Sequence, residues 1–194
     1  MKTFKVSFFG HSYIRDLEKL GNFEVTVDDR FSIECSYFYR PGGTARYFSE
    51  NKRDLGPLLS SSPDVVVVFL GGNDLRLDWS IYDTISDYKS LISYLSSELP
   101  GMPIICSYIE HRFAPANNHF NTPDPIVYKS LARKFNNWLQ RWKIPYRKFI
   151  TWGTNRLENR DLFKRDGVHL NEQGLVLLWD LLEDLSLKVV ESLM

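Results

Sequence analysis

The chain is 194 residues long, which suits one domain over residues 1–194. Lysine plus arginine and aspartate plus glutamate each number 24, so the net charge is zero and no global field indicates nucleic acid or a charged surface as partner. No apolar run approaches the roughly 20 residues of a membrane span, and the start MKTFKVSFFGHS lacks signal-peptide features, which predicts an intracellular, cytoplasmic protein.

Strand-like and helix-like segments alternate along the chain. The predicted strands cover residues 4–9, a β-rich pair at 23–27 and 31–39, then 64–70, 102–109 and 146–152. The predicted helices cover residues 13–20, 44–52, 80–98, 125–142 and 172–192, and a long polar loop takes up 110–124. The turn-like DDR inside the β-rich pair indicates a hairpin or a bent second strand. Asn171 is expected to cap the last helix, with Leu170 and Leu175 as a hydrophobic staple.

This alternation predicts an α/β fold with a parallel sheet covered by helices on both faces. The unbroken apolar run DVVVVFL at 64–70 is typical of a central parallel strand buried on both sides. Five such strands commonly take the order 2-1-3-4-5, in which a ligand crevice opens between strands 1 and 3, beyond their carboxyl ends.

Four short motifs follow predicted strands or precede the last helix. They are Gly10-His11-Ser12, Pro41-Gly42-Gly43-Thr44, Gly71-Gly72-Asn73-Asp74 and Asp166-Gly167-Val168-His169. In a doubly wound sheet all four are expected to meet at one edge, where the ligand crevice lies.

Three of these residues have the chemistry that acyl transfer requires. Ser12 can attack a carbonyl carbon, and His169 can take its proton as general base. Asp166 stands three residues before His169, close enough to accept a hydrogen bond from the imidazole Nδ1–H. The spacing therefore predicts a Ser-His-Asp triad.

An oxyanion hole needs hydrogen-bond donors aimed at the developing negative charge. The candidates are the backbone N–H of Ser12, one N–H from the Gly42-Gly43 turn and the side-chain amide of Asn73. Glycine suits the second position, because it lets the backbone approach a substrate without a Cβ in the way.

Each of these residues also has a structural interpretation when taken alone. Ser12 could be a plain helix N-cap, and Asn73 could be a turn residue. Asp74 could cap the following helix, and His169 could be a surface or packing histidine. The four motifs in order favour the catalytic interpretation.

The motifs resemble the four blocks of the SGNH hydrolases, also called the GDSL esterase/lipase family, which carry Ser, Gly, Asn and His. The resemblance spans nearly the whole chain and implies a flavodoxin-like three-layer α/β/α fold. It implies Ser12 as nucleophile, His169 as base and Asp166 as its orienting residue. Gly42 matches the family glycine best, because it stands two residues before Thr44, with Gly43 as the second choice; Asn73 matches the oxyanion asparagine.

The family's usual Gly-Asp-Ser reads Gly-His-Ser here, so His11 replaces an acid that helps to fix the nucleophile turn. We expect the chemistry to survive, with altered local hydrogen bonds and an altered pH profile. GHS followed by IRDL also resembles esterase-like domains in the first open-reading-frame protein of some LINE-type retrotransposons.

Other polar groups receive ordinary interpretations. His111 and His119 on the loop have no partner at metal-ligand spacing, so we predict no metal and no other cofactor. The basic residues at 133–148, interleaved with tryptophans, could contact anionic lipid or nucleic acid, but a solvated helix face is favoured. Cys35 and Cys106 lie in apolar contexts and are interpreted as buried thiols without a disulfide.

These observations predict a serine esterase acting on small-molecule ester or lipid substrates, with a short acyl group such as acetyl. Two alternatives are kept. One is a carbohydrate O-acetyl esterase. The other is a catalytically weak or inactive module of the same fold that binds lipid or nucleic acid within a larger retroelement protein; His11 and the basic residues at 133–148 motivate it.

Overall fold

A six-stranded sheet forms the centre of the fold in the described part of the chain. The computed structural model describes residues 2–21, 24–26, 31–110, 112–113, 123–142, 149–152, 157 and 159–193. The strands are β1 (Lys2–Gly10), β2 (Glu24–Thr26), β3 (Phe31–Tyr39), β4 (Val65–Phe69), β5 (Ile104–Ser107) and β6 (Phe149–Trp152), in the spatial order β2-β3-β1-β4-β5-β6.

Five of these strands are parallel and take the order predicted from the sequence. β1 lies between β3 and β4, and β5 and β6 extend the sheet beyond β4. The expected count of five strands is corrected to six, because β2 adds an antiparallel edge strand in which Val25 opposes Ile33 of β3. The β-rich pair near the N-terminus is thus a hairpin rather than one bent strand.

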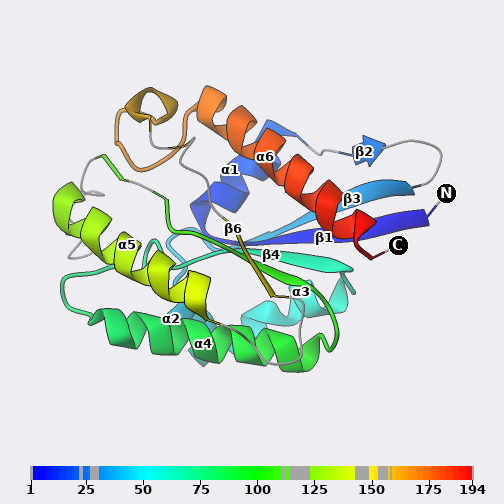
Figure 1. Cartoon of the computed structure of the whole chain (residues 1–194), viewed down its shortest axis with the longest axis horizontal. Coiled ribbons are helices and arrows are strands. Elements are labelled where there is room, and N and C mark those ends of the chain that lie inside the picture. The colour runs from blue at the N-terminus through cyan, green and yellow to red at the C-terminus, as the bar shows by residue number, and fades with distance from the viewer. Residues whose placement is uncertain are drawn as a thin grey trace.

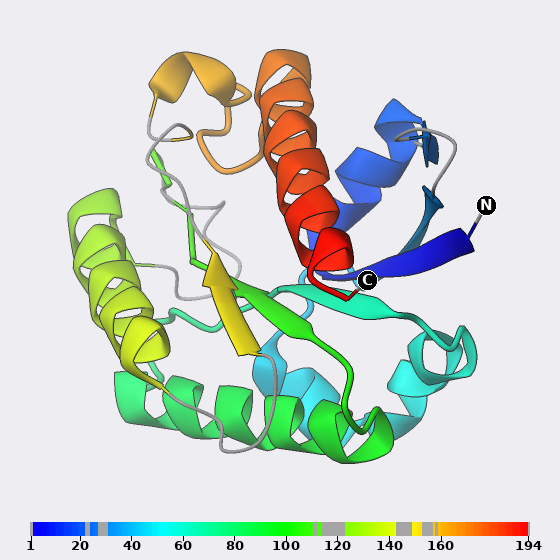
Figure 2. The same cartoon turned by 45° about the vertical axis from the view of Figure 1, so that its right-hand side comes forward.

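Helices cover both faces of the sheet, so the fold has the three layers that were expected (Figure 1). The helices are α1 (Ser12–Leu20), α2 (Ala45–Glu50), α3 (Gly56–Ser60), α4 (Ile81–Glu98), α5 (Pro125–Arg141) and α6 (Glu172–Glu191). α1 and α6 lie on one face, and α2 to α5 lie on the other, as the rotated view also shows (Figure 2).

Successive side chains of a strand point to opposite faces of the sheet, so the unbroken apolar run of β4 gives both faces an apolar surface. Val65, Val67 and Phe69 pack in one buried cluster with α1 and α6. Val66 and Val68 pack in a second cluster with α4 and α5. Burying both faces of the central strand requires a helix layer on each side, which places all the crossover loops at the two ends of the sheet.

The carboxyl ends of β1 and β4 approach closely, and a glycine makes this possible. A Cβ on Gly10 would lie 2.2 Å from the carbonyl oxygen of Phe69. The N–H of His11 donates to that oxygen at 3.3 Å, and the N–H of Arg40 donates to the Gly10 carbonyl at 3.0 Å. The chain segments that follow β1, β3 and β4 therefore start from one small area at this edge of the sheet.

Several local predictions can be compared with the structure. Both cysteines are free thiols; the expected burial is confirmed for Cys106 and wrong for Cys35, which is only partly buried. Asn171 caps α6 by accepting a hydrogen bond from the Gly174 N–H at 3.0 Å, and Leu170 and Leu175 are buried in the same cluster. His111, His119 and residues 143–148 lie outside the described residues.

No helix in the described part of the chain is long and apolar enough to cross a membrane.

Candidate active site

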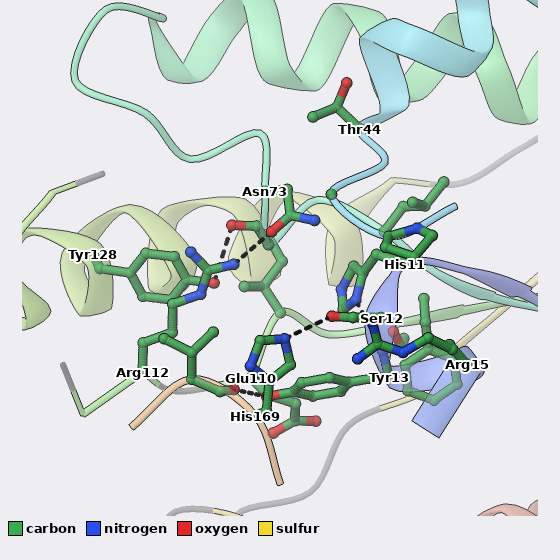
Figure 3. A pocket seen from close by; sticks show the side chains of 18 of the residues that line it. His11, Ser12, Tyr13, Arg15, Thr44, Asn73, Glu110, Arg112, Tyr128 and His169 are labelled. Atoms are coloured by element: carbon green, nitrogen blue, oxygen red, sulfur yellow. Dashed lines mark hydrogen bonds between the residues drawn. The ribbon is translucent and has the colours of Figure 1, made fainter. Parts of the chain in front are cut away.

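The four sequence motifs meet at the carboxyl edge of the sheet, around a cavity of about 390 Å³. Ser12, Gly42, Asn73 and His169 all line this cavity. Figure 3 shows three of them, Ser12, Asn73 and His169. They come from the segments after β1, β3 and β4 and from the segment before α6. The structure thus brings together residues that are more than 150 positions apart, since Ser12 and His169 are separated by 157.

Ser12 is the first residue of α1, and its hydroxyl faces His169. The distance from Ser12 Oγ to His169 Nε2 is 3.1 Å. The interpretation of Ser12 as a helix N-cap is wrong, because His11 holds that position and its Nδ1 accepts from the Tyr13 N–H at 3.4 Å. With the cap supplied by its neighbour, Ser12 keeps its hydroxyl for the contact with His169.

Asp166 orients the ring of His169. His169 Nδ1 lies 2.8 Å from Asp166 Oδ2. The other carboxylate oxygen accepts from the N–H groups of Val168 and His169, at 2.9 and 3.0 Å. Because an ionised carboxylate only accepts, Nδ1 carries the proton, and Nε2 is left as the acceptor that faces Ser12.

The surroundings of Asp166 favour its ionised form. Partial burial raises the pKa of Asp166, but hydrogen bonds from the backbone N–H groups of His169 and Val168 and from the His169 ring lower it. The net effect is a pKa below the ordinary value. At neutral pH the carboxylate is therefore charged and can stabilise an imidazolium on His169.

The two expected glycines differ in their surroundings. Gly42 lines the cavity and has a φ of +73°, a left-handed conformation that favours glycine. Gly43 is buried, and its N–H donates to the carbonyl of Arg40 at 2.8 Å. The N–H of Gly43 is thus already engaged, which favours Gly42 over Gly43 as the candidate oxyanion donor.

Asn73 lines the cavity, and its side-chain amide is hydrogen-bonded to the chain segment that carries Gly42 and Gly43. Its Nδ2 donates to the carbonyl of Gly43 at 3.2 Å. Its Oδ1 accepts from Nη2 of Arg112 at 2.8 Å. Figure 3 shows the amide oxygen turned to Arg112 and the nitrogen on the side of Ser12.

With this geometry in place, the family can be assigned. The model of the GDSL-like Lipase/Acylhydrolase family matches residues 37–175. This match covers most of the chain and contains three of the four motifs, while Gly10-His11-Ser12 precedes it. The chain belongs to the GDSL-like lipase/acylhydrolase family. The class of enzyme expected from the sequence, a carboxylic ester hydrolase, is thereby confirmed.

Solved structures of this family's fold resemble the whole chain. An acetyl esterase mutant with an acetate ion is 15% identical, with a TM-score of 0.67, and the similarity covers 98% of this chain and 100% of that one. A family 3 carbohydrate esterase from Clostridium thermocellum is 17% identical (TM-score 0.66, 99% of both chains). The corresponding enzyme from Talaromyces cellulolyticus is 14% identical (TM-score 0.65, 97% and 99%). At these identities the likeness shows the fold, the SGNH hydrolase fold expected from the sequence. No curated protein sequence matches the chain.

His11, which stands where the GDSL family usually has an acid, is a partly buried, neutral imidazole. Desolvation lowers the pKa of His11 to about 3, and the positive charge of Arg112 and the His169 ring lower it as well. The ring packs edge-on against Tyr13, with centroids 5.1 Å apart. Since Nδ1 accepts the cap hydrogen bond, the proton of the neutral ring is on Nε2.

Sequence reasoning missed three cavity residues. Tyr13 donates through its hydroxyl to the carbonyl of Val168 at 2.7 Å, which ties α1 to the segment of His169. Arg112 and Tyr128 lie on the far side of Asn73. Their roles depend on contacts between distant segments, and a single arginine in a polar loop has no motif that would reveal it.

The described residues contain no group of three or more His, Cys, Asp or Glu side chains that could hold a metal ion.

Proposed function

We propose that the chain is a serine esterase that hydrolyses carboxylic esters through an acyl-enzyme on Ser12. The observation that carries the proposal is the chain of contacts from Ser12 Oγ to His169 Nε2 (3.1 Å) and from His169 Nδ1 to Asp166 (2.8 Å) at the wall of a cavity. A nucleophile, a base and an orienting acid in hydrogen-bond reach are what this chemistry requires.

In the first half-reaction the Ser12 oxygen attacks the carbonyl carbon of the ester while His169 Nε2 takes the hydroxyl proton. The carbonyl oxygen becomes an oxyanion, for which the donors are the N–H groups of Ser12 and Gly42 and the amide of Asn73. The carbon–oxygen bond to the alcohol then breaks, and the imidazolium of His169 protonates the leaving alkoxide.

In the second half-reaction water attacks the acyl-enzyme, and His169 again takes the proton. The tetrahedral intermediate collapses, Ser12 recovers its proton from His169, and the carboxylic acid leaves. Asp166, ionised and bonded to Nδ1, holds the ring in one tautomer through both steps.

The substrate class that we propose is an ester with a short acyl group, such as acetyl. The cavity volume of about 390 Å³ lies near the small end of the range for ligand sites, and it must hold the acyl group and the first part of the alcohol. Similar structures include an acetyl esterase, which is consistent with a small acyl group.

A carbohydrate O-acetyl esterase is the second candidate within this class. The cavity walls combine aromatic side chains with charged ones, among them Tyr108, Arg76 and Glu110. Such walls suit an alcohol rich in hydroxyl groups, and two of the similar structures are carbohydrate esterases.

The alternative of a lipid- or nucleic-acid-binding module has less support. The structure has an open cavity beside the contact between Ser12 and His169, which a module without catalysis would not need. Arg133, Lys134 and Arg141 are exposed on α5, and the rest of the basic segment lies outside the described residues.

The test is the hydrolysis of 4-nitrophenyl esters from acetate to octanoate. We expect turnover that is highest for the shortest acyl chains and that falls about 10³-fold or more in Ser12→Ala. Ser90→Ala, which removes an exposed hydroxyl from α4, serves as the control and should keep wild-type turnover. Equal turnover by Ser12→Ala and the wild type would refute the proposed nucleophile.

A further inference from the structure

The side-chain amide of Asn73 is held at both ends. Its nitrogen donates to the carbonyl of Gly43, and its oxygen accepts from the guanidinium of Arg112. A carbonyl only accepts and a guanidinium only donates, so the two neighbours permit one orientation of the amide. In that orientation one N–H remains for the cavity. A flipped amide would instead present its oxygen to a developing oxyanion and repel it.

Arg112 is itself fixed from two sides. Its guanidinium lies over the ring of Tyr128, 4.7 Å from the centroid, and the buried Tyr128 donates to the carbonyl of Gly72 at 3.4 Å. The next residue, Phe113, donates its N–H to the Gly167 carbonyl at 2.7 Å and packs its ring against Phe163, with centroids 5.0 Å apart.

These contacts connect two halves of the site. Gly72 belongs to the turn that carries Asn73, and Gly167 lies between Asp166 and His169 in the sequence. The dipeptide Arg112-Phe113 thus touches the turn of the oxyanion candidate and the segment of the general base.

The guanidinium of Arg112 has a different kind of partner from those of the other arginines at the cavity. Arg15 pairs with Asp16 at 2.6 Å, and Arg76 pairs with Asp78 at 2.9 Å. In the described part of the chain, Arg112 makes no ion pair with a carboxylate and donates to an amide oxygen. Donation by a cation into Oδ1 polarises the amide, which makes the remaining N–H of Asn73 a stronger donor.

We propose that Arg112 is a positioning residue for ester hydrolysis, which sets the orientation of the Asn73 amide and strengthens its N–H toward the oxyanion. This inference rests on the proposed function, because it assigns Arg112 a role through Asn73. Arg112 should stabilise the transition state, in which the oxyanion forms, and should contribute little to the binding of the ester.

The first test is the steady-state kinetics of Arg112→Met on the acetyl ester. We expect kcat to fall about tenfold or more, with KM changed less than about threefold, since a single oxyanion donor accounts for roughly 10²–10³ in kcat and the variant only weakens one. Arg112→Lys should recover part of kcat, because the ammonium can still donate to Oδ1 but lacks the planar fork. Arg133→Met removes an exposed arginine from α5 and should leave kcat unchanged.

The second test asks whether Arg112 acts through Asn73. In an Asn73→Ala background, Arg112→Met should lower kcat by less than about twofold, because the amide that it positions is gone. The same loss in both backgrounds would overturn the proposal, and so would a wild-type kcat in Arg112→Met.

A readout without turnover separates this proposal from the proposed function. In ¹⁵N-labelled protein the side-chain NH₂ of Asn73 should have a high order parameter that drops in Arg112→Met and stays high in Arg133→Met. A drop in protein that hydrolyses no ester would contradict the proposed function, and with it a role in ester hydrolysis, while showing that Arg112 still holds the Asn73 amide. An unchanged order parameter in Arg112→Met would refute the positioning role, whatever the activity.

Discussion

His11 is an uncharged residue at the position of the nucleophile motif where the family usually has an acid. His11 is the N-cap of α1, and its Nδ1 accepts a hydrogen bond from the Tyr13 N–H. It does so without a negative charge, because burial and Arg112 lower the pKa of His11 to about 3. The proposed base His169 therefore has one carboxylate partner, Asp166, in the described part of the site.

Restoring the family acid should shift the pH dependence of the reaction. In His11→Asp a carboxylate near His169 would stabilise the imidazolium, so a higher pH is needed to free the base. We expect the acidic limb of kcat/KM to move to higher pH by about half a unit to one unit. The measurement is the profile of kcat/KM on the acetyl ester from pH 5 to 9.

His11→Asn is the matched control for this change. Asparagine caps a helix as well as aspartate does but adds no charge. Its acidic limb should stay where the wild type has it. A limb that moves equally in both variants, or that moves to lower pH in His11→Asp, would contradict the electrostatic explanation.

At the level of elements, Asp74 links the turn after β4 to the start of α2. Its Oδ1 accepts from the N–H of Ala45 at 2.8 Å and from that of Arg46 at 3.4 Å. The alternative interpretation of Asp74 as the cap of the following helix is wrong: Ser80 caps α4, and Asp74 binds the start of an earlier helix. Because α2 begins two residues after Gly43, this contact holds the segments of the two candidate oxyanion donors, Gly42 and Asn73, side by side.

The carboxyl of Asp74 should make stability depend on pH. Burial raises the pKa of Asp74 to about 7, against the opposing hydrogen bonds from Ala45 and Arg46, and its Oδ2 is buried without a hydrogen-bond partner. The folded state then holds a proton that the unfolded state loses near pH 4. The free energy of unfolding should fall as pH rises from about 4 to about 7, by at most about 4 kcal/mol from this group, and change no further above that.

Asp74→Asn tests this dependence, because the amide resembles the protonated acid and does not titrate. Urea unfolding at pH 4.5, 6 and 8 should give a smaller decline in the free energy of unfolding for Asp74→Asn than for the wild type. An identical decline in the two proteins would show that other groups cause it.

At the scale of the whole molecule, the sheet explains how much of the site could be predicted. Parallel strands end at a common edge, so the motifs that follow β1, β3 and β4 had to come together there. The same reasoning places the DGVH motif, which precedes α6, at this edge. The apolar run of β4 and the capped helix α6 carried strong local signals. The candidate residues Ser12, Asn73, Asp166 and His169 come together at this edge, and their catalytic roles stay predictions.

What the sequence did not reveal depends on contacts across the fold. The β-rich stretch at 23–27 was predicted, but the choice between a hairpin and a bent strand depended on the antiparallel pairing of the three-residue β2 with β3. The short helix α3, five residues long, has no clear period of its own. Arg112 matters through its contacts with Asn73 and Tyr128, which are 39 and 16 positions away in the sequence. A single domain over residues 1–194 stays a prediction.

The central claim is that Ser12 is a nucleophile activated by His169. The most direct measurement is labelling with an alkyl fluorophosphonate, followed by peptide mass spectrometry, on the wild type, Ser12→Ala and His169→Ala. We predict one phosphonyl group on the peptide that contains Ser12 in the wild type, none in Ser12→Ala and labelling slowed by several orders of magnitude in His169→Ala. A wild type that stays unlabelled while folded, or that is labelled on another serine, would contradict the claim.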